Sequence, residues 1–69
     1  MNYPKYYKSA AHNIKVISKI HSVWVTSKRI ESEDYDLLRH IQDLKTEEST
    51  ETEFKKAFNK TSKYLKSLI

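Results

Sequence analysis

The absence of glycine is the strongest constraint on how this chain folds. None of its 69 residues is glycine, and its only proline is Pro4. Sheets and hairpins depend on glycine at turns that need positive φ, so a chain without glycine is a poor candidate for them. Asparagine, serine and aspartate remain to make the turns. We therefore expect an all-α fold.

The first thirty residues contain no acidic side chain and show a helical period. Basic side chains recur there at steps of three and four, which places them along one side of a helix. They are Lys5, Lys8, His12, Lys15 and Lys19. A mostly apolar set follows the same rhythm and points the opposite way: Tyr3, Tyr7, Ala10, Ile14, Ile17, His21 and Trp24. The spacing predicts one long helix over residues 4–30.

The segment from His21 to Ser27 is the one part of this stretch that also alternates like a short strand. We assign it to the helix because nothing near it in the sequence offers a paired strand or a tight hairpin turn.

Two shorter helices are predicted after the first. Ser32 is a suitable N-cap for a helix over residues 32–45, whose apolar side is Leu37, Leu38, Ile41 and Leu44. Thr50 and Glu53 form a capping box, which predicts a third helix over residues 50–68. Its apolar side is Phe54, Ala57, Phe58, Thr61, Leu65 and Leu68.

The predicted lengths do not match, and this suggests self-association. A helix over 4–30 is about 40 Å long, whereas one over 32–45 reaches only about 20 Å. The long helix also carries a second apolar row beside the first. We expect a single domain, 1–69, that forms a homodimeric helical bundle of three-helix units. The partner interface is assigned to Val16, Ile20, Val23 and Trp24.

The charge is divided into blocks along the chain. Residues 1–30 carry +6, residues 31–53 carry −7 and residues 54–69 carry +5, within a net charge of +4. The acidic block is either a docking surface or the result of placing carboxylates at helix starts, and the sequence leaves both open. The two basic blocks are the candidate binding surfaces.

Catalytic, metal and cofactor chemistry have no support in the sequence. There is no cysteine, and the three histidines, His12, His21 and His40, show no helical zinc spacing. No glycine loop exists to hold a phosphate. We expect no enzyme, no metal site and no cofactor.

No stretch is apolar enough for a membrane span or a signal peptide, so we expect a cytoplasmic protein. The abundance of Lys, Asn, Ile, Tyr and Ser is typical of AT-rich coding sequences, such as those of many bacteria and phages.

Two main functions remain. The first is a small regulatory or accessory protein that binds nucleic acid or a nucleoprotein complex through basic helix faces. The lysines assigned to it are Lys5, Lys8, Lys15, Lys19, Lys55, Lys56 and Lys63. The alternative is a protein-binding inhibitor or adaptor of the phage or mobile-element type, which covers a surface of a larger host enzyme. A purely structural, self-associating unit is a third possibility, and binding to anionic lipid ranks below the first two.

Overall fold

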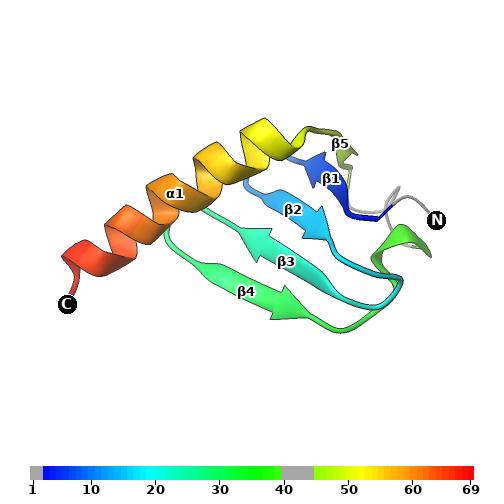
Figure 1. Ribbon diagram of the computed structural model, residues 1–69, viewed down its shortest axis with the longest axis horizontal. Coiled ribbons are helices and arrows are strands. Elements are labelled where there is room, and N and C mark those ends of the chain that lie inside the picture. The colour runs from blue at the N-terminus through cyan, green and yellow to red at the C-terminus, as the bar shows by residue number, and fades with distance from the viewer. Residues whose placement is uncertain (1–2, 40–44) are drawn as a thin grey trace.

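The structure, a computed structural model that describes residues 3–39 and 45–69, is an antiparallel sheet crossed by one helix (Figure 1). Four strands follow one another along the chain: β1 (Lys5–Lys8), β2 (Asn13–Val16), β3 (Ser22–Val25) and β4 (Ile30–Glu33). A 3₁₀ turn η1 (Leu37–Arg39), a short strand β5 (Glu47–Glu48) and the helix α1 (Glu51–Ser67) complete the described elements. The strand order is β4-β3-β2-β1-β5, and each pair of neighbours is antiparallel.

The prediction of an all-α, three-helix bundle is wrong. Residues 4–30 hold β1, β2, β3 and the start of β4 instead of one helix. The described part of 32–45 holds the end of β4 and η1, while Ile41 and Leu44 lie outside the described residues. The fold is α+β, and α1 lies within the range predicted for the third helix. The mismatch in helix lengths that suggested a homodimer therefore does not exist.

The hairpins form without glycine because their loops are four or five residues long. Each loop is closed by a backbone hydrogen bond of 2.9 Å, from Ser9 N to His12 O, from Ile17 N to His21 O, and from Thr26 N to Arg29 O. Loops of this length are usually built around turns with negative φ. Among the described residues only Lys45 has positive φ, at 51°. Glycine is therefore not needed at these turns.

The main core lies on the sheet face turned away from α1, which we call the far face. Register and alternation place these residues on it: Lys5, Tyr7, Ile14, Val16, Ser22, Trp24, Glu31 and Glu33. Ile14 and Val16 are 0% and 1% exposed, and Leu37 of η1 packs over them. The indole Nε1 of Trp24 donates to Ser22 Oγ at 2.8 Å, so these two polar groups satisfy each other.

The other face, which we call the helix side, carries α1. Phe54 is 7% exposed and its ring lies 5.7 Å from that of Tyr6. About two turns after Phe54, the buried Thr61 hydroxyl donates to the carbonyl of Thr26 at 2.5 Å. Val25 is buried on this side as well. An aromatic contact and a hydrogen bond therefore fix α1 to the sheet at two points.

The start of α1 is held by the predicted cap. Thr50 Oγ1 accepts a hydrogen bond from Glu53 N at 3.2 Å. The Glu53 carboxylate does not reach back to Thr50; it accepts from Ser49 Oγ at 2.9 Å and from Lys8 Nζ at 3.0 Å. The cap is therefore tied to β1 as well as to the helix.

The end of α1 extends past the sheet (Figure 1). Its 17 residues span about 25 Å at 1.5 Å per residue, and α1 has its strongest contacts with β2 and β3. Beyond Leu65 every residue is exposed, and Leu68 reaches 66%. The molecule is elongated as a result, at 36 × 21 × 20 Å.

Lys8→Met should make thermal stability less dependent on pH in acid. Hydrogen bonds from Lys8 and Ser49, together with the Lys8 charge, lower the pKa of Glu53. A carboxyl group with a lowered folded-state pKa adds stability above its unfolded pKa, and this is lost as pH falls through the folded pKa. The Tm gap between wild type and Lys8→Met should therefore narrow from about pH 7 to about pH 2. Lys63→Met, which removes an exposed lysine farther along α1, is the control. A Tm gap that does not change with pH would contradict a stabilising contact between Lys8 and Glu53.

Candidate functional site

The predicted lysine row of residues 1–30 is divided between the two faces of the sheet. Lys5 lies on the far face, with its Nζ 5.9 Å from the centroid of the Tyr3 ring. Lys8 and Lys15 lie on the helix side, and Lys19 is exposed in the loop after β2. Lys8 is also paired with Glu53 at 3.0 Å and Glu47 at 3.9 Å. These four lysines therefore do not form one basic surface.

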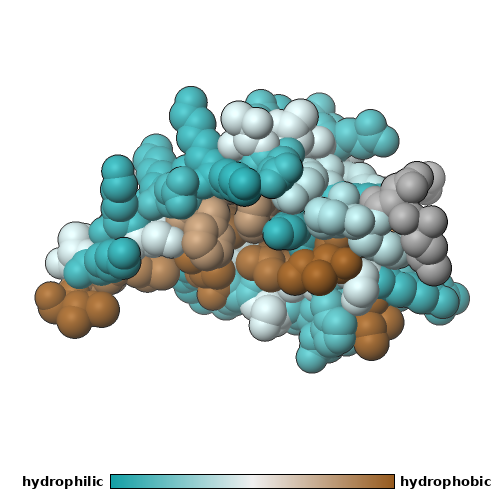
Figure 2. Space-filling view, viewed as in Figure 1, coloured by the Kyte–Doolittle hydropathy of each residue, from teal (hydrophilic) through white to brown (hydrophobic). Residues whose placement is uncertain are grey.

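The lysines of α1 do form one. Four of them recur at steps of three and four along the side that points away from the sheet or flanks it. We call this set the lysine ridge: Lys56, Lys60, Lys63 and Lys66. All four are exposed, and they cover about 15 Å of helix. Figure 2 shows hydrophilic side chains over the outward side of α1.

The acids that the structure describes form no ion pair with the ridge, although the charge of Lys56 contributes to the lowered pKa of Glu53. Within residues 3–39 and 45–69, none of its four ammonium groups has a carboxylate within ion-pair distance. Lys55 differs, because its Nζ lies 2.8 Å from Glu51 Oε1. That hydrogen bond and the opposite charge raise the pKa of Lys55 and lower that of Glu51. Of the predicted lysines, Lys56 and Lys63 belong to the ridge, whereas Lys55 is engaged beside it.

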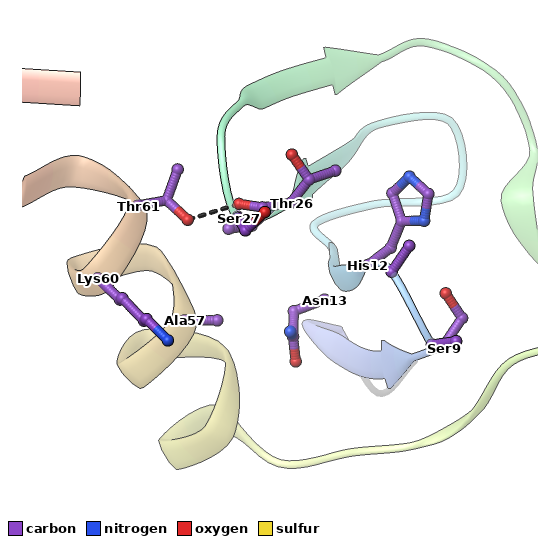
Figure 3. Close-up of a pocket in the computed structure, with 11 residues that line it drawn as sticks. Ser9, His12, Asn13, Thr26, Ser27, Ala57, Lys60 and Thr61 are labelled. Atoms are coloured by element: carbon purple, nitrogen blue, oxygen red, sulfur yellow. Dashed lines mark hydrogen bonds between the residues drawn. The ribbon is translucent and has the colours of Figure 1, made fainter. Parts of the chain in front are cut away.

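A pocket of about 240 Å³ lies between the ridge and two hairpin loops (Figure 3). Its polar lining includes Ser9 and Asn13 at the first hairpin, Ser27 at the third, and Lys60 of α1. Hydroxyl, amide and ammonium groups are donors to anions, and none of the described residues that line the pocket carries a carboxylate. The pocket is therefore suited to a phosphate or carboxylate group.

Contacts between α1 and the hairpins position the elements around this pocket. The hydrogen bond from Thr61 to Thr26 joins α1 to the third hairpin at one edge (Figure 3). The Lys60 side chain extends from α1 on the side where Asn13 lies (Figure 3). His12 lines the pocket, but its ring turns away from α1 and meets Trp24 edge-on at 5.4 Å. The position of Lys60 over the pocket thus depends on the docking of α1.

The four predicted interface residues do not share a surface. Val16 is buried in the far-face core, and Trp24 is half-buried on the same face. Ile20 is exposed in the loop between β2 and β3. Val23 lies on the helix side, where it joins Ile17, Phe58 and others in an apolar groove of about 260 Å³ beside α1. Of the four residues, Val23 is therefore the one that lines an apolar groove open to a partner on the helix side.

Some residues of the site were not identified from sequence. Lys60 and Lys66 continue the three-and-four spacing of Lys56 and Lys63 in a block without acids, so the signal for them was present. Ser9 and Ser27 gave no signal, because only the hairpin loops bring them to α1.

Among the residues that the structure describes, no group of three or more histidine or acidic side chains is placed to hold a metal ion. In the same residues, no helix has the length and apolar character that crossing a membrane requires. Comparison of the chain with known families, curated proteins and solved structures finds no match.

Proposed function

We propose that this protein is a small, non-enzymatic regulatory or accessory protein that binds nucleic acid, alone or in a nucleoprotein complex, through α1. The observation that supports this most is the lysine ridge, an exposed row of ammonium groups along about 15 Å of helix. Surface helices usually mix charge signs to gain i,i+4 pairs, whereas α1 carries no acid after Glu53. Such a surface favours a polyanion.

The ridge dimensions fit a phosphate backbone. Successive phosphates of one strand of duplex DNA are spaced by about 3.4 Å along the axis, so about 15 Å of helix faces about four of them. In this proposal one phosphate enters the pocket beside Lys60, where Ser9, Asn13 and Ser27 supply neutral donors. Contacts of this kind position a protein on nucleic acid without reading bases. Binding is therefore expected to depend on salt and only weakly on sequence.

The double variant Lys56→Glu/Lys63→Glu should weaken binding to a labelled DNA or RNA duplex at least about tenfold in low salt. It should also reduce the slope of log K against log salt by about two, because two phosphate contacts are lost. Fluorescence anisotropy at several salt concentrations measures both quantities. Circular dichroism checks that α1 is retained.

Lys5→Glu/Lys19→Glu is the matched control, since it changes net charge equally but lies away from the ridge. Its affinity should fall less than about threefold. Equal losses in the two variants would mean that net charge alone drives binding. Absence of binding by the wild type would remove the proposal.

A protein-binding inhibitor or adaptor is the second candidate. The apolar groove favours it, because Phe58 and Ile17 are exposed at 36% and 48% beside Val23. Hydrophobic surface also lies along the underside of α1 and at its C-terminal end (Figure 2). Association through such a surface should change little with salt, which separates it from phosphate binding.

A further inference from the structure

A second pocket opens on the far face, across the sheet from α1. It has a volume of about 380 Å³ and is lined by His12, Trp24, Glu31, Glu33 and Tyr35. We propose that this pocket binds the cationic end of an arginine or lysine side chain from a protein partner. This site is separate from the lysine ridge and does not depend on nucleic-acid binding.

The aromatic wall of the pocket is held in place by neighbouring groups. The indole of Trp24 is fixed by its hydrogen bond to the buried Ser22. The His12 ring meets it edge-on at 5.4 Å, and the Tyr35 ring lies 6.4 Å away with a 35° angle between the planes. These rings therefore present a preformed aromatic surface to whatever enters the pocket.

The acidic wall comes from β4. Glu31 and Glu33 are two positions apart on one strand, so both side chains stand on the far face, and Glu31 is the register partner of Trp24. Burial and then the charge of Glu33 raise the pKa of Tyr35, which is consistent with a carboxylate close to that ring. Two carboxylates therefore lie beside an aromatic surface in one open pocket.

This combination selects cations over other ligands. A guanidinium or ammonium group is attracted to the face of an aromatic ring, and to tryptophan most strongly. Its N–H groups can at the same time donate to a carboxylate, and a guanidinium can do so with two parallel bonds. Carboxylates repel phosphate, so the ligand class of the lysine ridge is excluded here. An arginine or lysine side chain can contact both walls, because its charged end can pair with a carboxylate while it also lies against the aromatic rings.

An internal cation already shows that one of these carboxylates accepts a guanidinium. Arg29 Nη2 lies 2.8 Å from Glu31 Oε1, with both side chains largely exposed. Exposed pairs of this kind are weak, so an incoming cation can displace Arg29. Arg29 is not among the residues that line the pocket, and it therefore acts as a competitor for Glu31.

The test uses N-acetyl-arginine amide and N-acetyl-lysine amide as probes, with N-acetyl-norleucine amide as the uncharged control. Trp24 is the only tryptophan, so its indole N–H gives a single NMR signal that reports on this pocket. Both cationic probes should move this signal saturably below about 50 mM, and the norleucine probe should not. No saturable shift, or an equal shift with norleucine, would overturn the proposal.

Variants decide whether the two walls act as described. Glu33→Gln and Tyr35→Leu should each weaken arginine binding about fivefold, since the first removes the attraction to a carboxylate and the second the attraction to an aromatic ring. Arg29→Ala should strengthen it about threefold by freeing Glu31. Glu48→Gln and Tyr64→Leu, which change the same residue types elsewhere, are the matched controls and should bind like wild type. Unchanged binding in Glu33→Gln, or weaker binding in Arg29→Ala, would refute the site.

Discussion

Ile14→Ala should lower the free energy of unfolding by about 2–5 kcal/mol, which is comparable with the whole stability of a domain of this size. Ile14 has no exposed surface and packs with Val16 and Leu37 in the far-face core. Removing its outer carbons leaves a cavity that two neighbouring strands cannot close without losing register. Urea unfolding followed by circular dichroism measures the loss.

Ile17→Ala is the matched control for this experiment, since it makes the same change three residues later at a largely exposed position. It should cost less than about 1 kcal/mol. A loss at Ile14 as small as that at Ile17 would contradict the placement of the core on the far face.

Phe54→Ala should lower the free energy of unfolding by about 3–5 kcal/mol, because Phe54 docks α1 on the helix side of the sheet. The ring of Phe54 is the largest buried group of α1, and its contact with Tyr6 joins the helix to β1. A helix of this length is marginal in water without tertiary contacts. Loss of docking should therefore also reduce the circular dichroism signal of the folded protein at 222 nm. Urea unfolding followed at this wavelength measures the change in the free energy of unfolding.

Phe58→Ala is the control for Phe54→Ala, because it removes an equal ring one turn later from the same helix. Phe58 is exposed to more than a third, and the rings of Phe54 and Phe58 lie 6.1 Å apart. Its substitution should cost clearly less, about 1 kcal/mol. If Phe58→Ala were the more destabilising of the two, the orientation of α1 on the sheet would be wrong.

The helix was predictable because its signals are local. Thr50 and Glu53 sit at the spacing of a capping box, and the Thr50 side chain accepts the Glu53 N–H in the structure. The apolar positions that follow recur with the helical period through the segment that becomes α1. Everything needed for this prediction lies within twenty residues and does not depend on distant parts of the chain.

The sheet was not predicted because the apolar residues of its different strands recur along the sequence at steps typical of a helix. Tyr7, Ile14 and Trp24 belong to a series with steps of three and four residues, so on a helix they would fall within an arc of about 100°. In the structure the same three residues are register partners across β1, β2 and β3 and share the far face. Periodicity alone does not distinguish these two arrangements.

The absence of glycine was also given too much weight. It excludes the two-residue hairpin turns that need positive φ, but not the longer loops found here. Thr26 shows how such a loop is stabilised, because its hydroxyl accepts the N–H groups of Lys28 and Arg29. The alternation in the segment from His21 to Ser27 was a correct indication of a strand, since β3 lies within it.

The candidate site also contains residues that local sequence patterns predict and residues that only the tertiary fold brings together. The ridge residues Lys56 and Lys63 follow from the amphipathic pattern of one helix. The pocket beside Lys60 combines two hairpin loops with α1, so it exists only after the sheet has formed. The cation pocket likewise needs Trp24 of β3 beside Glu31 of β4. Sites assembled from several strands require the register, which the sequence pattern did not supply.

The overhang of α1 has a consequence for the lysine ridge. Its last turns gain little support from the sheet, and they carry like charges three apart at Lys60, Lys63 and Lys66. Repulsion among these ammonium groups opposes helix formation where packing contributes least. Counterions or a bound polyanion weaken that repulsion. The stability of the last helical turns therefore depends on the ions around them. We therefore expect the C-terminal turns of α1 to be more helical when a polyanion is bound or when the ionic strength is high.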